Sequence, residues 1–298
     1  MIVSENDKKR KIFICTTFRD FNGTENDEIQ KLFLESLKNQ TYQNFELVVT
    51  IFKEKNVESK IIEFNLPVKF YYDSSQDYKY SHTEVLLNCI KEADNILPNC
   101  IFIWTTADVI FEKDFFENIN KYLPTKSFGT SIPHLIYKGL DSYFKKEGHY
   151  WGLIAGIDTI FFDGSVVTND FFNDLKFYKN INYGYFEYFL TAMGIKYANS
   201  LVNFQPINNI HKIMNPNIPT IVNYDFIKKS ENINKKTFFN FVKKNKMNYK
   251  FYLHGVLYYR PIKNKLNFYW KFKHDIIYAI FRYLKFSLKT IIMSWKKN

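Results

Sequence analysis

The stretch CIFIWTTADVIFEKDFFEN, Cys100–Asn118, indicates the class of fold. Its first residues, Cys100–Trp104, form an apolar run typical of a buried strand, and a short polar turn ending in Asp108 follows. In an open α/β sheet, the carboxyl end of such a strand borders the crevice that binds ligands. A carboxylate there can hold a divalent cation that carries substrate phosphates. The alternative is that Asp108 caps the next turn at the surface.

Strand-like and helix-like patterns alternate upstream of this stretch, and an acid-rich helix start at Glu112–Glu117 follows it. The sequence predicts strands at Lys11–Thr16, Phe45–Phe52 and Val68–Tyr72, and helices at Glu28–Asn39, Val57–Phe64 and Ser81–Ala93. Near-continuous apolar strands in a β-α-β-α-β-α-β order predict an α/β fold whose parallel sheet is covered on both faces.

The charge and the cysteine content of the chain indicate what kind of partner it binds and in which cellular compartment it lies. The 298 residues carry a net charge of +11, which favours anionic partners. The three cysteines, Cys15, Cys89 and Cys100, lie in apolar segments without metal-ligand spacing, so we expect reduced thiols in a cytoplasm. The first residues include no apolar run long enough for a signal peptide, and we expect the protein to stay inside the cell.

Leu32–Thr50, LFLESLKNQTYQNFELVVT, resembles the first helix and second strand of the family-2-like glycosyltransferases of the GT-A fold. Thr106-Ala107-Asp108 falls where that family carries an Asp-x-Asp metal motif, with Thr106 in place of the first acid. The resemblance covers Lys11–Asn120 and, more loosely, Tyr150–His211. It implies a GT-A domain over 1–224, a nucleotide-sugar donor that contacts Thr106 and Asp108, and Mn²⁺ or Mg²⁺ bound by Asp108.

The same resemblance places further donor contacts. Thr16, Thr17 and Arg19 stand where the family begins its nucleotide pocket, and a guanidinium suits a phosphate; alternatively, Arg19 is a solvated loop charge. Asp73 either contacts the nucleotide or caps a turn. The family's acidic turn after the second strand is replaced here by Thr50–Lys53, so we expect recognition of the base to differ.

The middle of the chain supplies candidates for the acceptor side. Tyr150–Phe162 resembles a family strand, and Asn182–Met193, closed by Gly194, resembles the family's short acidic helix. Glu187 is the only acid in that helix and our candidate general base, which would take the proton from the acceptor hydroxyl. Asp158 is the alternative base.

Two later residues complete the candidate site. Some enzymes of the GT-A fold use a late histidine, which implies that His211 contacts the metal or a phosphate; a solvated histidine in a polar loop is the other interpretation. Lys212 lies in the same segment and can offset diphosphate charge.

Residues 225–298 are rich in Lys, Asn and aromatic residues and end in a basic amphipathic segment. Arg282, Lys285 and Lys289 would each cost about 2.5–3.5 kcal/mol at the centre of a bilayer, whereas basic residues gain about 1 kcal/mol each near anionic lipid. We therefore expect the segment to lie on the anionic inner membrane surface. Packing of its apolar face onto the first domain is the alternative, and nucleic-acid binding is not expected because no recognisable module is present.

These patterns together predict a cytoplasmic-face glycosyltransferase, peripheral at the membrane, that moves a sugar onto a lipid-linked or polysaccharide acceptor. The resemblance favours bacterial surface-glycan assembly and inversion at the anomeric carbon. Two other classes stay open: a non-catalytic GT-A-like binding subunit of a glycan-assembly complex, and a basic peripheral membrane or nucleic-acid-binding protein whose α/β domain is a scaffold.

Overall fold

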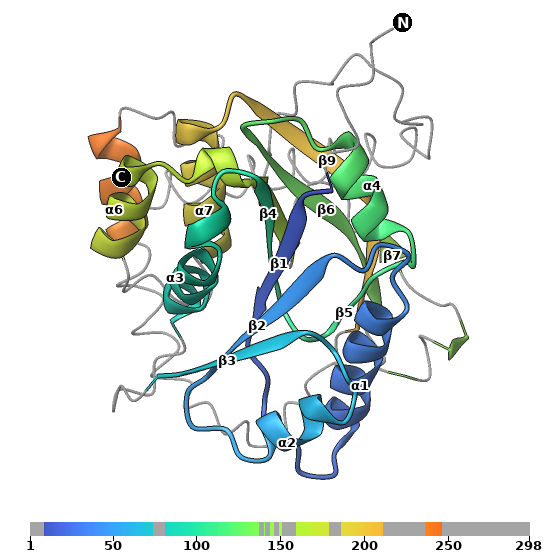
Figure 1. Ribbon diagram of the computed structural model, residues 1–298. Helices are drawn as coiled ribbons and strands as arrows, with labels where there is room; N and C mark the ends of the chain where they lie inside the picture. Colours follow the sequence, from blue (N-terminus) through green and yellow to red (C-terminus); the bar gives the residue numbers. More distant parts are fainter. Residues whose placement is uncertain are drawn as a thin grey trace, which may run out of the picture.

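The computed structural model describes residues 9–73, 81–136, 140, 144–145, 149–150, 159–178, 186–210 and 236–245. A nine-stranded sheet lies between two layers of helices (Figure 1), which confirms the predicted α/β class. The strands are β1 Lys11–Thr16, β2 Phe45–Ile51, β3 Val68–Tyr72, β4 Cys100–Thr105, β5 Val109–Ile110, β6 Ser127–Ile136, β7 His149–Tyr150, β8 Thr159–Asp163 and β9 Ser200–Ile210. The helices are α1 Glu25–Lys38, α2 Val57–Ile62, α3 His82–Glu92, α4 Phe115–Tyr122, α6 Asn169–Phe177, α7 Phe186–Tyr197 and one over 236–244.

The strand order is β3-β2-β1-β4-β8-β6-β9-β5, with β7 paired to β6. The strands predicted from the first part of the chain, β1 to β4, pair in parallel as expected. The second part mixes directions, because β8 is antiparallel to both β4 and β6 while β9 is parallel to β6. The sequence did not predict β6 and β9, which mix polar residues and a proline into their apolar positions.

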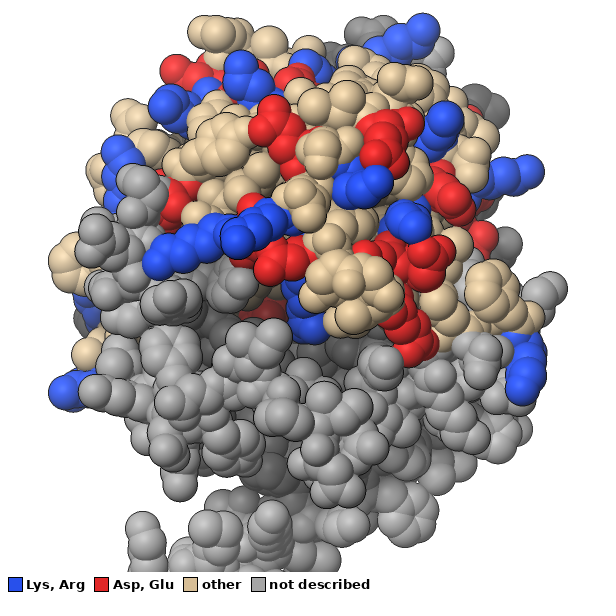
Figure 2. Space-filling view, turned by 90° about the horizontal axis from the view of Figure 1, so that it is seen from below, with Lys and Arg blue, Asp and Glu red and all other residues tan. Residues whose placement is uncertain are grey.

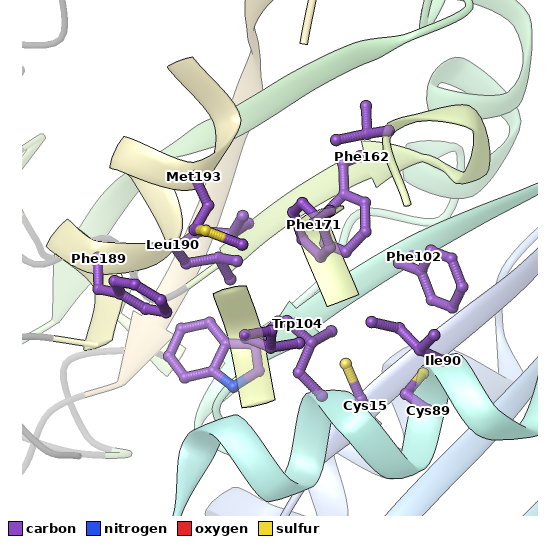
Figure 3. Close-up of a cluster of buried hydrophobic side chains, with 14 of the residues drawn as sticks. Cys15, Cys89, Ile90, Phe102, Trp104, Phe162, Phe171, Phe189, Leu190 and Met193 are labelled. Atoms are coloured by element: carbon purple, nitrogen blue, oxygen red, sulfur yellow. The ribbon is translucent and has the colours of Figure 1, made fainter. Parts of the chain in front are cut away.

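Each face of the sheet has its own hydrophobic core. Helices α1, α2 and α4 cover one face, where Phe33 and Phe116 are fully buried. Helices α3, α6, α7 and 236–244 cover the other face, around Trp104 and Phe162 (Figure 3). The three cysteines are free and buried in this second core, and burial raises the pKa of the Cys100 thiol to about 12.

One expectation for the middle of the chain needs correction. Gly194 does not end a helix but lies inside α7, where an added Cβ would sit 2.3 Å from the Phe128 ring. It is therefore a site of close packing between α7 and β6 rather than a C-cap. Of the strand expected at Tyr150–Phe162, Tyr150 lies in β7 and Thr159–Phe162 lie in β8, while residues 151–158 lie outside the described residues.

An ion pair is buried at the end of the sheet where β1 begins. The Arg10 guanidinium lies 2.9 Å from Asp163 at the end of β8, and both side chains are at most 10% exposed. Arg10 also donates to the carbonyl oxygens of Asn120 and Leu123 at the end of α4. Asp163 accepts from the backbone N–H groups of Lys126 and Ser165. Every charged group in this network is thus satisfied, as burial of a charge requires.

The helix over 236–244 adds Phe238, Phe241 and Val242 to the second core, so part of the segment predicted to follow the first domain packs on it. In the parts of the chain described above, no helix combines the length and the apolar character needed to cross a membrane.

Replacing one partner of the buried ion pair should destabilise the fold strongly. Arg10→Met leaves the Asp163 carboxylate buried without its counter-charge, and we expect the free energy of unfolding to fall by about 3–5 kcal/mol. Denaturant titration measures this loss. The double variant Arg10→Met/Asp163→Leu should recover part of it, since the uncompensated charge is then gone; a double variant less stable than Arg10→Met alone would contradict this account.

Candidate active site

The carboxyl ends of β1 and β4 meet at one edge of the sheet. Cys15 pairs with Trp104, so the turns that follow Thr16 and Thr105 start side by side. Three side-chain atoms in these turns are buried without a hydrogen-bond partner in the described part of the chain: Thr17 Oγ1, Thr106 Oγ1 and Asp108 Oδ1. An unsatisfied buried polar group costs about 1–3 kcal/mol, so this cluster is poised to gain from a polar ligand or water.

A row of hydroxyl side chains lies behind these turns. Thr105 pairs with Thr159 across β4 and β8, with 2.9 Å between their hydroxyl oxygens. Thr130 pairs with Ile160, which places the next β6 residue, Ser131, beside Thr159. Thr16, Thr105, Thr159 and Ser131 are each at most 3% exposed, and Ser131 Oγ has no partner among the described residues. The carboxyl edge is therefore polar where the strand interiors are apolar.

Hydrogen bonds that involve backbone groups fix the loop after β1 to α1 and to the loop after β2. The Arg19 N–H donates to Gln30 Oε1 at 2.6 Å, and Gln30 Nε2 donates back to the Arg19 carbonyl at 3.3 Å. Asp20 then accepts from the backbone N–H of Lys55, which joins this loop to the one after β2. The Arg19 side chain is exposed and makes no ion pair with any described residue, so it is available to an anion at this edge.

An acid that the sequence analysis missed lies in the loop after β2. One oxygen of Glu54 accepts from the N–H groups of Phe52 and Lys53, at 2.8 and 3.1 Å. Its other oxygen is buried and has no partner in the described part of the chain. Glu54 lines a cavity of about 410 Å³ together with Val57 and Tyr72. The signal was present in the sequence, because Glu54 directly follows Thr50–Lys53, where the family's acid is lacking.

Two further candidates are described near the same edge. Asp73 follows β3, and its N–H donates to the Ile51 carbonyl at the end of β2. Glu187 lies in the first turn of α7, directly after Phe186, whose ring packs 5.0 Å from that of Trp104. The contact brings the start of α7 to the end of β4.

Six predicted residues follow or end the parallel strands at their carboxyl ends: Thr16, Thr17, Arg19, Asp73, Thr106 and Asp108. The predicted base, Glu187, lies at the start of α7 near the end of β4. Asp158, His211 and Lys212 lie outside the described residues.

Asp108 fits the binding of a divalent cation together with substrate. Among the described residues, no group of three or more His, Cys, Asp or Glu side chains is arranged to hold a metal. Mg²⁺ sites, however, commonly use one or two carboxylates completed by substrate phosphates and water. Asp108 has one buried carboxylate oxygen that is unpartnered within the described residues, and its chemistry fits one such ligand.

No protein-family model and no curated protein matches the chain. Among solved structures, a protein described as a nucleotide-diphospho-sugar transferase from Desulfovibrio desulfuricans G20 is 10% identical, with a TM-score of 0.42 over 76% of this chain and 98% of that one. The mannosyltransferase PcManGT from Pyrobaculum calidifontis, solved with GDP-Man and Mn²⁺, is 11% identical, with a TM-score of 0.46 over 82% and 68%.

A third similar structure is 4-diphosphocytidyl-2C-methyl-D-erythritol synthase from Anaerococcus prevotii DSM 20548. It is 11% identical, with a TM-score of 0.38 over 76% of this chain and 97% of that one. Nucleotide-sugar transferases, the class that the sequence resemblance predicted, are therefore among the solved structures similar to this chain.

Proposed function

We propose that this chain is a glycosyltransferase that moves a sugar from a nucleotide-sugar donor to a hydroxyl of a lipid-linked or polysaccharide acceptor, in the assembly of a bacterial surface glycan. The observation that carries the proposal is the cluster of unpartnered Thr17, Thr106 and Asp108 atoms at the carboxyl ends of β1 and β4. This edge is where open α/β sheets bind ligands. The sequence resemblance supports a sugar nucleotide as that ligand.

The diphosphate of the donor would lie against the two turns. Asp108 would hold Mn²⁺ or Mg²⁺, which reduces the charge on the departing nucleoside diphosphate when it is bound. The hydroxyls of Thr17 and Thr106 donate to phosphate oxygens, and the exposed Arg19 guanidinium pairs with a phosphate. Lys212 is proposed to assist in the same way, and His211 to contact the metal or a phosphate.

The nucleobase would enter the cavity beside Glu54. The unpartnered Glu54 oxygen accepts a hydrogen bond from a ring or amino N–H of the base. Tyr72 lines the same cavity and is 65% exposed, so one face of its ring is open to stacking. This arrangement would replace the acidic turn that the family carries immediately after its second strand.

Glu187 would act as the general base. Its carboxylate takes the proton of the acceptor hydroxyl as that oxygen attacks the anomeric carbon, while the bond from this carbon to the diphosphate breaks. A single displacement of this kind inverts the anomeric configuration. Asp158 is the alternative base.

The charge distribution supports a membrane-surface site for the acceptor. Residues 246–298 hold 12 Lys and Arg against one acid, so the net charge of +11 lies wholly in this segment, while residues 1–245 hold 29 cations and 29 acids. Figure 2 shows basic and acidic side chains interspersed on one end of the described part of the molecule. We propose that the C-terminal segment docks on the anionic inner face of the cytoplasmic membrane, where a lipid-linked acceptor resides.

Thr106 stands in place of the first acid of the family's metal motif, and this replacement favours one alternative function. A non-catalytic binding subunit with a GT-A-like domain would need neither metal nor donor, and the following measurement separates the two.

Removing the Asp108 charge should abolish metal-dependent nucleotide binding. A nucleoside diphosphate at about 100 times its Kd should stabilise the wild type by roughly 2.7 kcal/mol, a shift in Tm of a few degrees. We expect one nucleotide to do so only with Mn²⁺ or Mg²⁺, and Asp108→Asn to lose the shift. Asp94→Asn, an exposed acid outside the site, is the control. If no nucleotide shifts the wild type, the binding-subunit function replaces the transferase.

Glu187→Gln should impair the chemical step selectively. General-base catalysis contributes about 10²–10⁴-fold, so turnover should fall by that factor while the nucleotide-induced Tm shift persists. Radiolabelled sugar transfer measures turnover, with Glu28→Gln on the exposed side of α1 as the control. A normal rate in Glu187→Gln combined with a dead Asp158→Asn variant would move the base to Asp158.

Neutralising basic residues of the C-terminal segment should weaken membrane binding. Arg282→Gln/Lys285→Gln/Lys289→Gln removes three cations worth about 1 kcal/mol each, so binding to phosphatidylglycerol vesicles should fall roughly 100-fold. Flotation of the full chain measures this, and the control replaces the exposed Lys38, Lys69 and Lys121. Equal binding to phosphatidylcholine vesicles, or salt-sensitive binding to oligonucleotides instead, would contradict the membrane proposal.

A further inference from the structure

A histidine outside the predicted site lies at a junction of three elements. His82 is the first residue of α3, whose N-terminus is capped by the Ser81 hydroxyl through the Glu84 N–H. Its ring centroid lies 5.3 Å from that of Trp104, edge to face, and 5.5 Å from that of Phe186. The start of α3, the end of β4 and the start of α7 therefore meet around one imidazole.

The two rings that pack against this imidazole are apolar, and its nitrogens bond to none of the described residues. Trp104 and Phe186 are at most 1% exposed, whereas His82 is only half-buried. In the described part of the chain, neither of its ring nitrogens has a hydrogen-bond partner. Burial lowers the pKa of His82 to about 4, so the ring is neutral at physiological pH and offers one N–H donor and one nitrogen acceptor. A half-buried imidazole of this kind, without a partner among the described residues, can form hydrogen bonds with a ligand through both nitrogens.

The position of His82 indicates which ligand it serves. Glu187, the proposed base, directly follows Phe186, and Trp104 lies two residues before Thr106 in the turn that leads to Asp108. The imidazole thus lies on the α7 side of β4, against the ring of the residue that precedes Glu187 and against that of Trp104.

We propose that His82 contacts the acceptor and holds its reacting hydroxyl by a hydrogen bond beside Glu187, a specificity-determining contact that rests on the proposed transferase function. A neutral imidazole that resists protonation is a poor proton acceptor near neutral pH. It is well suited to orienting a neutral hydroxyl, as donor through one nitrogen and acceptor through the other. The acceptor recognised here is accordingly an uncharged, hydroxyl-bearing sugar unit.

His82→Phe tests this contact because it keeps an aromatic ring beside Trp104 and Phe186 and removes both hydrogen-bonding nitrogens. Turnover of nucleotide sugars is measured in the full chain, with methyl glycosides of neutral hexoses or water as acceptor. We expect the KM for the preferred methyl glycoside to rise, or kcat to fall, by at least tenfold, while the Tm and the nucleotide-induced Tm shift stay at wild-type values. His82→Gln, which restores a donor and an acceptor, should recover part of the loss.

Tyr197→Phe is the matched control. It removes a polar atom from the other end of α7, where the Tyr197 hydroxyl donates to Asp174, and it should leave the acceptor KM unchanged. An active wild type with unaltered acceptor kinetics in His82→Phe would overturn this inference alone. A wild type that turns over no nucleotide sugar with any acceptor would overturn both the transferase function and the role of His82.

Discussion

The buried ion pair between Arg10 and Asp163 anchors the arrangement of the whole sheet. It ties the residue before β1 to the last residue of β8, and its additional hydrogen bonds reach the end of α4 and the turn before β6. With Asp163 opposite Ile101, the antiparallel register brings Thr159 opposite Thr105 at the other end of β4. Because a slip of one residue would exchange the two faces of β8, an anchor at one end also determines which side chains reach the functional edge.

Buried polar groups have hydrogen-bond partners at one end of the parallel strands and lack them, among the described residues, at the other. At the amino end, the charges of Arg10 and Asp163 are compensated by each other and by backbone groups, so that their burial is tolerated. At the carboxyl end, the buried atoms of Thr17, Thr106 and Asp108 lack partners among the described residues, which lowers stability where a ligand can restore it. This division is expected of an enzyme, because a site that satisfied itself internally would have little left to bind its substrate.

The rings of His82, Trp104 and Phe186 connect the second core to the candidate site. The rings of Trp104 and Phe186 belong to the core that Figure 3 depicts in part, and their contact joins the end of β4 to the first turn of α7. A rigid apolar contact of this kind holds the start of α7, and with it Glu187, near the end of β4. Packing of buried rings thus performs the positioning that hydrogen bonds perform in the loop between Arg19 and Gln30.

Local sequence patterns were sufficient for β1 to β4 and for the helices between them, because apolar runs and helical periodicity are properties of neighbouring residues. They also predicted that Thr17 and Asp108 follow the ends of buried parallel strands, since the end of such a strand can be recognised in the chain itself. The neighbours of Gly194, Ser131 and His82 could be identified only in the folded molecule. Gly194 leaves room for the Phe128 ring, which any larger side chain would contact too closely. Ser131 lies beside Thr159 on the neighbouring strand, and the His82 ring packs against those of Trp104 and Phe186. Each of these depends on residues distant in the chain that only the packed sheet and helices bring into contact.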